Sequence, residues 1–404
     1  MDTVLNESKY PEQWGLSGLS LPWKNRLYRK VTNKLFKHRI RGELRSVILV
    51  AHNIMMLEKM KAVVDMIKDD RIQWFCTIVT PPDESKELIQ EIKKYNYTYI
   101  HPYQASIQLW DLIMVADHHA TYNFNDSIPK VLIDHGVGDS KVIVNSKERY
   151  HYARTNVLDK TKKPVYSCIF ESSEQHKQEV INDIPALKGC ISVVGHIEVD
   201  SILSLNKSRS ELRNEFGYSD TDIVIFICSS HGDGSLLDSI GHELIEEALM
   251  LPNKYKIILA SHFLNWQKTK NNEVVRGNSF LKYEGMRVRV LRPKDDFSNG
   301  VVVSDICLSD YTSASLFFTF LERPIIFIPF PEGVVSKLSS IWKLYCKAPR
   351  VNNVKDLHSI INDLPSYPKE ILTRYSSELD SYPGEAKKRI KSELYRLLKL
   401  SSQD

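Results

Sequence analysis

The fold is decided by residues 46–79, which read SVILVAHNIMMLEKMKAVVDMIKDDRIQWFCTIV. This stretch begins with a short apolar run at 47–51, continues with a helical pattern at 55–68, and ends in a second apolar run at 72–79. A buried strand, a helix and another buried strand make up a βαβ unit, in which the two strands are parallel. The stretch therefore predicts a parallel sheet with a helix packed against it.

The same alternation continues through the rest of the chain. Apolar runs and helical stretches form two groups of similar size, without an internal sequence repeat. Such a pattern predicts two α/β domains with mostly parallel sheets and right-handed crossovers. We predict a basic amphipathic segment at 1–45, a first Rossmann-like domain at 46–200, a second at 201–380, and a closing helix at 381–404.

Length and composition agree with this division. At 404 residues the chain is too long for one ordinary core, and its hydrophobic fraction of 42% and charged fraction of 26% are those of a globular protein. No apolar stretch approaches the ~18 residues that span a bilayer, so we expect membrane contact only at the protein surface. The six cysteines are scattered, without a Cys-x-x-Cys pair, and predict reduced thiols in the cytoplasm.

Residues 23–45 combine an apolar stripe with many basic side chains. An apolar residue recurs at every fourth position from Trp23 to Leu35, and lysines and arginines far outnumber the one acidic residue, Glu43. This pattern is typical of a helix at an anionic membrane surface, although a helix packed on its own domain explains it equally well. The rest of the chain has no extended basic stretch, so we expect no nucleic-acid partner. The predicted membrane-binding residues are Trp23, Arg29, Lys30 and Lys34.

Polar residues follow four of the apolar runs. In an open parallel sheet, ligands bind beyond the carboxyl ends of the strands, so these residues are candidates for a site. The first segment, at 134–140, reads DHGVGDS. Its glycines allow close approach of the backbone to a ligand, and its histidine can act as a general base near neutral pH. A turn that contains a hydrogen-bonded histidine is the alternative.

The other three segments lie in the second half. Residues 229–235 (SSHGDGS) and 308–315 (LSDYTSAS) offer hydroxyl and backbone N–H groups before a helix, where an anion such as phosphate is favoured. An ordinary loop or a helix cap is the alternative for both. His262, within 261–263, fits a functional or a structural role equally well. The predicted phosphate- or nucleotide-binding residues are Ser229, Ser230, His231, Gly232, Ser309, Asp310, Thr312 and Ser313.

Several common chemistries lack their motifs. The chain has no His-Glu-x-x-His, no cluster of cysteine and histidine ligands, and no Gly-x-Ser-x-Gly. Zinc and serine hydrolases therefore have little support. We predict no metal site and no cofactor, and we leave open whether a divalent ion is needed.

Taken in order, these motifs resemble those of the CDP-glycerol glycerophosphotransferase family, which builds teichoic acid and related capsule polymers. The similarity covers about 130–394. It is strongest at 309–313, which resembles the family's Ser/Thr-Asp-Tyr-Ser-Ser, and at 321–327, which resembles its Arg-Pro strand. His135 and Gly136 resemble its His-Gly.

Three further motifs extend the resemblance. His262 is similar to the histidine of the family's His-Pro. Gly195 and Asp200 stand where the family has a Gly-Tyr-Pro-x-x-Asp turn, and 382–386 resembles its closing Gly-x-Ala segment.

The resemblance implies a GT-B fold with two facing Rossmann-like domains. It also implies a peripheral enzyme at the inner face of the cell membrane, which transfers a polyol phosphate from a CDP-activated donor to a glycan or lipid-linked acceptor. His135 would activate the acceptor hydroxyl, His262 would contact the donor pyrophosphate, and 309–313 would hold its phosphates or nucleotide. The acceptor-side residues would be Gly136, Asp139 and His52.

The chain departs from the family at several positions. Phe263 replaces the proline after His262, 196–198 reads His-Ile-Glu in place of Tyr-Pro-Arg, and 137–139 reads Val-Gly-Asp in place of Thr-Pro-Leu. The loop at 231–234 also differs. These departures leave CDP-glycerol, CDP-ribitol and a nucleotide sugar open as the donor. The alternatives are a GT-B glycosyltransferase and a non-catalytic, membrane-associated adaptor.

Overall fold

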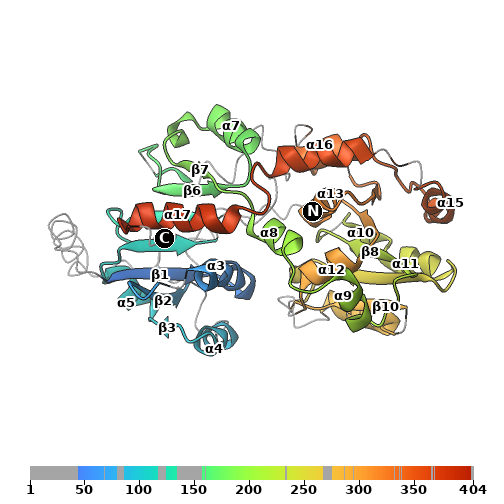
Figure 1. Ribbon diagram of the computed structural model, residues 1–404, viewed down its shortest axis with the longest axis horizontal. Helices are drawn as coiled ribbons and strands as arrows, with labels where there is room; N and C mark the ends of the chain where they lie inside the picture. Colours follow the sequence, from blue (N-terminus) through green and yellow to red (C-terminus); the bar gives the residue numbers. More distant parts are fainter. Residues whose placement is uncertain are drawn as a thin grey trace, which may run out of the picture.

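The computed structural model contains two α/β domains, each built around an open sheet flanked by helices (Figure 1). None of the described helices is long and apolar enough to cross a membrane. The described residues are 44–67, 69–79, 86–116, 124–133, 157–159, 161–232, 234–266, 275–285, 287–293, 295–331, 333–335, 337, 339–364, 367 and 369–401.

The first domain contains a parallel sheet of seven strands in the order β3-β2-β1-β4-β5-β6-β7. The central strands are buried on both faces, which explains why their sequences are continuous apolar runs. Figure 1 shows β1 running toward the second domain, so the carboxyl ends of this sheet face that domain. The strands are β1 (Arg45–Ala51), β2 (Ile72–Ile78), β3 (Thr98–Tyr99), β4 (Leu112–Val115), β5 (Lys130–Ile133), β6 (Cys168–Glu171) and β7 (Ile191–Val193).

The second domain contains a parallel sheet of five strands in the order β10-β9-β8-β11-β12. β8 lies at its centre, and its residues from Val224 to Cys228 are buried. The strands are β8 (Ile223–Cys228), β9 (Tyr255–Ala260), β10 (Val288–Leu291), β11 (Ile306–Ser309) and β12 (Ile325–Phe327).

Helices cover the two sheets. Those of the first half are α3 (Ile54–Met66), α4 (Lys86–Lys94), α5 (Pro102–Ile107), α7 (Glu174–Asp183), η2 (Pro185–Leu187), α8 (Ile197–Leu203) and α9 (Arg209–Glu215). Those of the second half are α10 (Leu236–Ser239), α11 (Gly241–Leu249), η3 (Phe263–Trp266), η4 (Arg276–Tyr283), α12 (Phe297–Val303), η5 (Ser313–Leu316), α13 (Phe317–Phe320), α14 (Ser340–Tyr345), η6 (Val354–Asp356), α15 (Leu357–Asn362), α16 (Lys369–Leu379) and α17 (Ala386–Leu398).

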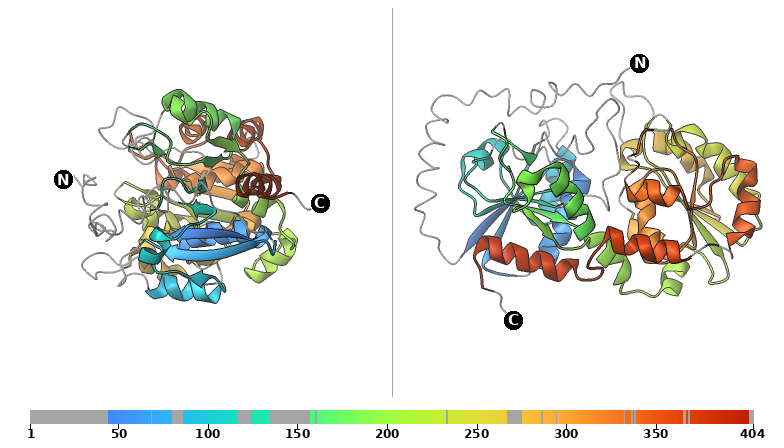
Figure 2. Two further views of the ribbon diagram at one scale, coloured as in Figure 1. Left: turned by 90° about the vertical axis from the view of Figure 1, so that its left-hand side faces the viewer. Right: turned by 90° about the horizontal axis from the view of Figure 1, so that it is seen from above.

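The C-terminal helix α17 returns to the first domain. Its residues Ile390, Leu394 and Leu398 belong to the same buried cluster as the β1 residues Val47 and Leu49. The preceding helix, α16, packs into the core of the second domain. Figure 2 shows the two helices running along one side of both domains. The chain therefore passes between the domains twice, once near α8 and once between α16 and α17, and the predicted boundary at residue 200 falls inside α8.

The two crossings are bonded to each other. The backbone N–H of His196 donates to Asp380 Oδ2 at 2.9 Å, and the N–H of Tyr382 donates to Oδ1 at 2.7 Å. Gly195 has a φ of +85°, and a Cβ there would lie 3.1 Å from both Asp380 Oδ1 and Tyr382 O. A side chain does not fit at this position, so the closeness of the crossings requires glycine. The two segments of the family resemblance at 195–200 and 382–386 thus meet at the domain junction.

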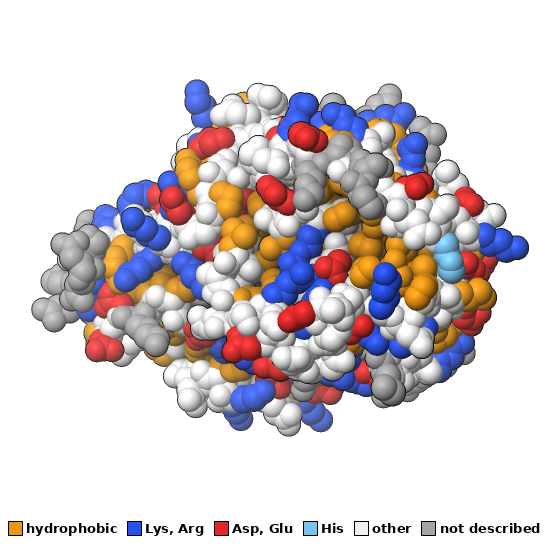
Figure 3. Space-filling model, turned by 45° about the vertical axis from the view of Figure 1, so that its right-hand side comes forward, with side chains coloured by type: hydrophobic (Ala, Val, Ile, Leu, Met, Phe, Trp, Pro, Cys, Tyr) orange, Lys and Arg blue, Asp and Glu red, His pale blue; other side chains and the backbone are white. Residues whose placement is uncertain are grey.

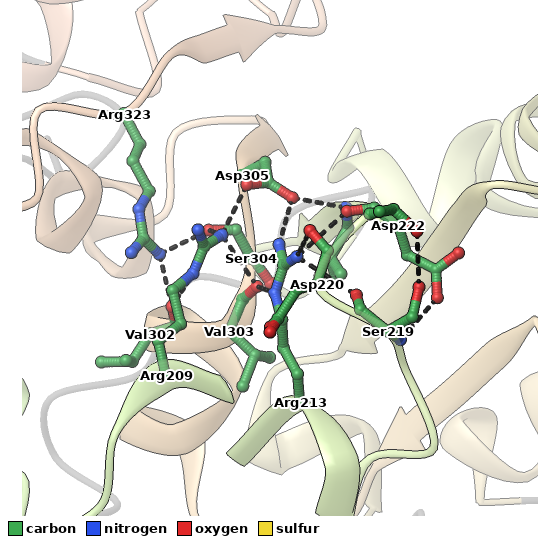
Figure 4. Close-up of polar contacts among 12 residues, drawn as sticks. Arg209, Arg213, Ser219, Asp220, Asp222, Val302, Val303, Ser304, Asp305 and Arg323 are labelled. Atoms are coloured by element: carbon green, nitrogen blue, oxygen red, sulfur yellow. Dashed lines mark hydrogen bonds and ion pairs between the residues drawn. The ribbon is translucent and has the colours of Figure 1, made fainter. Parts of the chain in front are cut away.

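Three arginines surround the C-terminal end of α12, at the amino-terminal edge of the second sheet (Figure 4). Arg209, Arg213 and Arg323 donate to the carbonyl groups of residues 301–304. The Asp305 carboxylate pairs with Arg209 and Arg213, and it also accepts the N–H of Val224 at 2.8 Å. Burial and the nearby Arg209 lower the pKa of Arg323 to about 10. The cluster fastens α9, α12 and the start of β8 together.

We expect Arg213→Met to lower the free energy of unfolding by about 3–5 kcal/mol, because it leaves the part-buried Asp305 with one fewer counter-charge. Arg213 is only 3% exposed and also donates to the carbonyl groups of 219, 220 and 222. Urea unfolding followed by circular dichroism measures the change. Arg374→Met, at an exposed pair with Glu378, is the control and should lose less than about 1 kcal/mol. Equal losses in the two variants would show that the cluster adds no special stability.

All six cysteines are free thiols, in agreement with the expected reduced state. Cys76, Cys168, Cys228 and Cys307 are buried in the strands, whereas Cys190 is half-buried and Cys346 is exposed.

Candidate active site

The second sheet has its topological switch point at β8. From β8 the chain builds β9 and β10 on one side, and it then crosses to place β11 and β12 on the other. Loops that leave neighbouring strands in opposite directions open a crevice at the carboxyl edge, where ligands bind. Three of the four predicted segments meet at this edge: 229–235 after β8, 261–263 after β9, and 308–315 at the end of β11.

Asp310 holds the loops of this edge together. Its carboxylate accepts the Ser229 hydroxyl at 2.8 Å and the backbone N–H groups of Ser230, Leu236 and Thr312 at 2.8–3.0 Å. The residue is 1% exposed, and burial raises its pKa while these hydrogen bonds oppose the rise. Both oxygens are thus already used by the protein, and Asp310 acts by positioning the loops around it.

The neighbours of Asp310 differ in how accessible they are. Ser309 is fully buried, with its hydroxyl 3.3 Å from the thiol of Cys228. Thr312 caps η5, because its hydroxyl accepts the N–H of Ala314 at 3.4 Å. Ser313 is half-buried at the start of η5. Of the predicted residues in 309–313, Thr312 and Ser313 therefore lie nearest the surface of the edge.

Two histidines lie against each other at this edge. The rings of His231, after β8, and His262, after β9, have centroids 4.2 Å apart and planes inclined by 31°. The N–H of Leu264 donates to His262 Nδ1 at 3.3 Å. In a neutral imidazole this leaves the proton on Nε2, which can donate to a ligand oxygen. The sequence placed the two histidines in separate segments, and the fold brings them together.

Two unpartnered polar atoms lie in the same segment as His262. Within the part of the chain that the structure describes, Ser261 Oγ and Asn265 Nδ2 are buried and have no hydrogen-bond partner. Asn265 is 4% exposed and lies in η3, three residues after His262. Buried polar groups are nearly always hydrogen-bonded, so these atoms are candidates for contact with a ligand. The sequence analysis missed Asn265, although its place in the loop after β9 was a usable signal.

Glycines shape the loop after β8. Gly232 and Gly234 have φ values of +90° and +85°, which side chains rarely adopt. A Cβ on Gly234 would lie 2.8 Å from Pro331 Cγ, in the loop after β12. The loops after β8 and β12 are thereby in contact, which closes one side of the edge.

The first domain contributes His52, which directly follows β1 and is half-buried. The next residue, Asn53, caps α3 by accepting the N–H of Met56 at 2.9 Å. His135, Gly136 and Asp139 lie outside the described residues. The membrane-binding residues Trp23, Arg29, Lys30 and Lys34 also lie outside them.

No group of three or more histidine, cysteine or acidic side chains within the described ranges is arranged to hold a metal ion. The face drawn in Figure 3 mixes basic, acidic and hydrophobic side chains, without a broad field of one charge.

Replacing Asp310 tests its positioning role. We expect Asp310→Ala to lower the free energy of unfolding by about 3 kcal/mol, because four donors lose their buried acceptor. Thermal unfolding of the full chain measures the effect, with Asp70→Ala, at an exposed position, as the control. If Asp310→Ala had the same melting temperature as Asp70→Ala, the positioning role given to Asp310 would be contradicted.

Comparison with known proteins gives no match to a family model and no match to a curated sequence. Solved structures do match. The wall teichoic acid polymerase TagF is 14% identical, covers 98% of this chain and 98% of its own, and has a TM-score of 0.63. A TagF structure soaked with CDPG covers 98% of this chain and 99% of its own, with 13% identity and a TM-score of 0.61.

Two structures with a uridine nucleotide match as well. UDP-GlcNAc 2-epimerase from Neisseria meningitidis, bound to UDP-GlcNAc, is 17% identical, covers 87% of this chain and 100% of its own, and has a TM-score of 0.53. MnaA from S. aureus, in a co-structure with UDP, is 14% identical, covers 89% of this chain and 99% of its own, and has a TM-score of 0.55. These similarities and the two parallel sheets confirm the predicted GT-B fold.

Proposed function

We propose that the protein transfers a polyol phosphate, either glycerol phosphate or ribitol phosphate, from a CDP-activated donor to a cell-surface glycan or lipid-linked acceptor. The polymer formed would be teichoic-acid-like or capsular. The pairing of His231 with His262 at the switch point of the second sheet carries this proposal, because the unpartnered Ser261 and Asn265 atoms adjoin it. The similarity to TagF along nearly the whole chain supports it.

In this proposal the nucleotide and pyrophosphate of the donor bind at the carboxyl edge of the second sheet. His262 donates from Nε2 to a pyrophosphate oxygen, because its Nδ1 already accepts from Leu264. Thr312 and Ser313 offer hydroxyl groups on the opposite side of the switch point. Transfer of a phosphoryl group depends mainly on holding its oxygens and stabilising their charge, which donors of this kind achieve.

The reaction exchanges one P–O bond for another. The acceptor hydroxyl oxygen attacks the phosphorus that carries the polyol, the bond from that phosphorus to CMP breaks, and CMP leaves with the bonding electrons. His135, the base that the family resemblance implies, takes the proton of the acceptor hydroxyl.

A second candidate is a GT-B enzyme that uses a nucleotide sugar. The match to an epimerase structure with UDP-GlcNAc and to a structure of MnaA with UDP favours keeping it. The two candidates share a nucleotide site and differ in the base that it selects and in the group that is transferred.

Donor binding separates these candidates. We expect the full chain to bind CDP-glycerol or CDP-ribitol in calorimetry in preference to UDP and GDP sugars. His262→Ala should weaken that binding at least about tenfold, since a hydrogen bond to a charged group contributes about 1.5–3 kcal/mol. His358→Ala, a half-exposed histidine on α15, is the control and should bind as the wild type does.

Each result points to one candidate. Selective binding of a uridine or guanosine sugar would replace the proposal with the glycosyltransferase. Binding of none of these compounds would favour the non-catalytic adaptor. Released CMP together with a polyol phosphate on the acceptor would identify the reaction as phosphate transfer.

Peripheral membrane binding through residues 23–41 is part of the same proposal. Changing Arg29, Lys30 and Lys34 together to glutamate should weaken sedimentation with phosphatidylglycerol vesicles by about tenfold or more, because each basic residue near the surface contributes about 1 kcal/mol. Neutral phosphatidylcholine vesicles are the control. Unchanged sedimentation would remove the membrane proposal and leave the catalytic one intact.

A further inference from the structure

A second polar cluster lies in the first domain, at the carboxyl ends of β5, β6 and β7. It lines a small pocket, with about 20 Å³ open to the centre of a water-sized group, between these strand ends and the helices α3 and α17. Most of the wall is apolar, and the polar side chains gather on one part of it. The apolar side chains are Ile133, Phe170, Val194, Ile197 and Ile390, and the polar ones are Lys59, Ser172, His196 and Glu198.

One charged side chain, Glu198, lies against the imidazole of this pocket. His196 Nδ1 lies 2.8 Å from Glu198 Oε2, and Glu198 also forms an ion pair with Lys59. Burial alone would raise the pKa of Glu198, but Lys59 and His196 hold that pKa well below its usual value. The ionised carboxylate favours a proton on Nδ1 of the neutral imidazole, which leaves Nε2 as an acceptor.

Two polar atoms on the pocket wall have no protein partner. His196 is 4% exposed and Ser172 is 3% exposed. Among the residues that the structure describes, none hydrogen-bonds to His196 Nε2 or to Ser172 Oγ, and the 2.8 Å contact of His196 Nδ1 with Glu198 lacks hydrogen-bond geometry. Polar groups this deeply buried are normally hydrogen-bonded. His196 Nε2 and Ser172 Oγ therefore indicate a ligand with hydrogen-bonding groups of its own.

The surroundings restrict the chemistry of that ligand. Lys59 and Glu198 neutralise each other, so the described side chains of the pocket leave no surplus positive charge to attract a phosphate. The apolar walls suit carbon-bound hydrogens, whereas an imidazole acceptor and a serine hydroxyl suit an O–H group. A neutral hydroxymethyl group fits both requirements.

The pocket also lies next to the second domain. The His196 ring packs edge-on against Phe317 of α13, with centroids 5.9 Å apart. Phe317 comes four residues after Ser313, about 8 Å along the 3-10 helix η5, so the donor segment is within reach of a ligand in the pocket. His135, the predicted base, follows Ile133 by two residues in the sequence.

We propose that this pocket binds the terminal hydroxymethyl group of a polyol acceptor. His196 Nε2 accepts the hydrogen bond of its hydroxyl group, and Ser172 Oγ is the second partner. The identity of the acceptor as a polyol rests on the proposed function. The chain has His-Ile-Glu at 196–198 where the resembling family has Tyr-Pro-Arg, so the site depends on residues particular to this chain.

The test measures polyol binding without the donor. Saturation-transfer NMR on the full chain, titrated with glycerol and with ribitol, should give a dissociation constant for at least one of them. Ser172→Ala and His196→Phe should each raise it about fivefold to tenfold, the effect of losing one hydrogen bond. His196→Gln, which keeps an acceptor, should retain most of the binding, and His358→Phe is the control for a histidine outside the pocket.

A second measurement separates this inference from the proposed function. In an assay with a CDP donor that the wild type converts, Ser172→Ala should raise the KM for the polyol acceptor and leave the KM for the donor unchanged. If both variants weaken polyol binding, the pocket is supported even when no CDP donor reacts. In that case the proposed function alone fails.

Equal polyol binding in wild type, Ser172→Ala and His196→Phe would overturn the inference. A wild type that releases CMP but binds neither polyol would also overturn it. Melting temperatures identify any variant that is misfolded, and Ser172→Ala keeps the backbone contacts of the junction.

Discussion

The side chain of Asp380 joins the two points at which the chain passes between the domains. One of its oxygens accepts the N–H of His196 and the other accepts that of Tyr382, within a junction so tight that residue 195 must be glycine. The carboxyl group is 1% exposed, and burial raises its pKa. Because both crossings converge on this group, the orientation of one sheet relative to the other depends on it, as does the meeting of His196 with Phe317.

The second domain uses two carboxylates in a similar way at both edges of its sheet, of which Asp305 is part-buried and Asp310 is buried. Asp305 joins the arginines to the amino-terminal start of β8, and Asp310 joins the loops at the carboxyl end. Together they fix β8 and β11 where the strand order changes direction. A rigid scaffold of this kind lets His231 and His262 lie close together on loops that are far apart in the sequence.

The sequence predicted the local features well, because buried parallel strands are apolar runs and sites follow their carboxyl ends. It did not predict features that depend on distant partners. Lys59 and Glu198 are 139 residues apart, and the return of α17 to β1 leaves no local pattern. The division of 236–249 into two helices, α10 and α11, at Ile240 is a further feature that the apolar pattern does not predict. His135 and the membrane segment stay predictions.

The position of α17 has a consequence for synthesis on the ribosome. Arg45, at the start of β1, donates to the carbonyl oxygen of Leu398 at 2.8 Å, across 353 residues of chain. The first domain is translated first, yet it cannot bury the surface that α17 covers until the last helix has emerged. A nascent or prematurely terminated chain therefore exposes an apolar groove beside β1, where a chaperone or protease can distinguish it from a completed molecule.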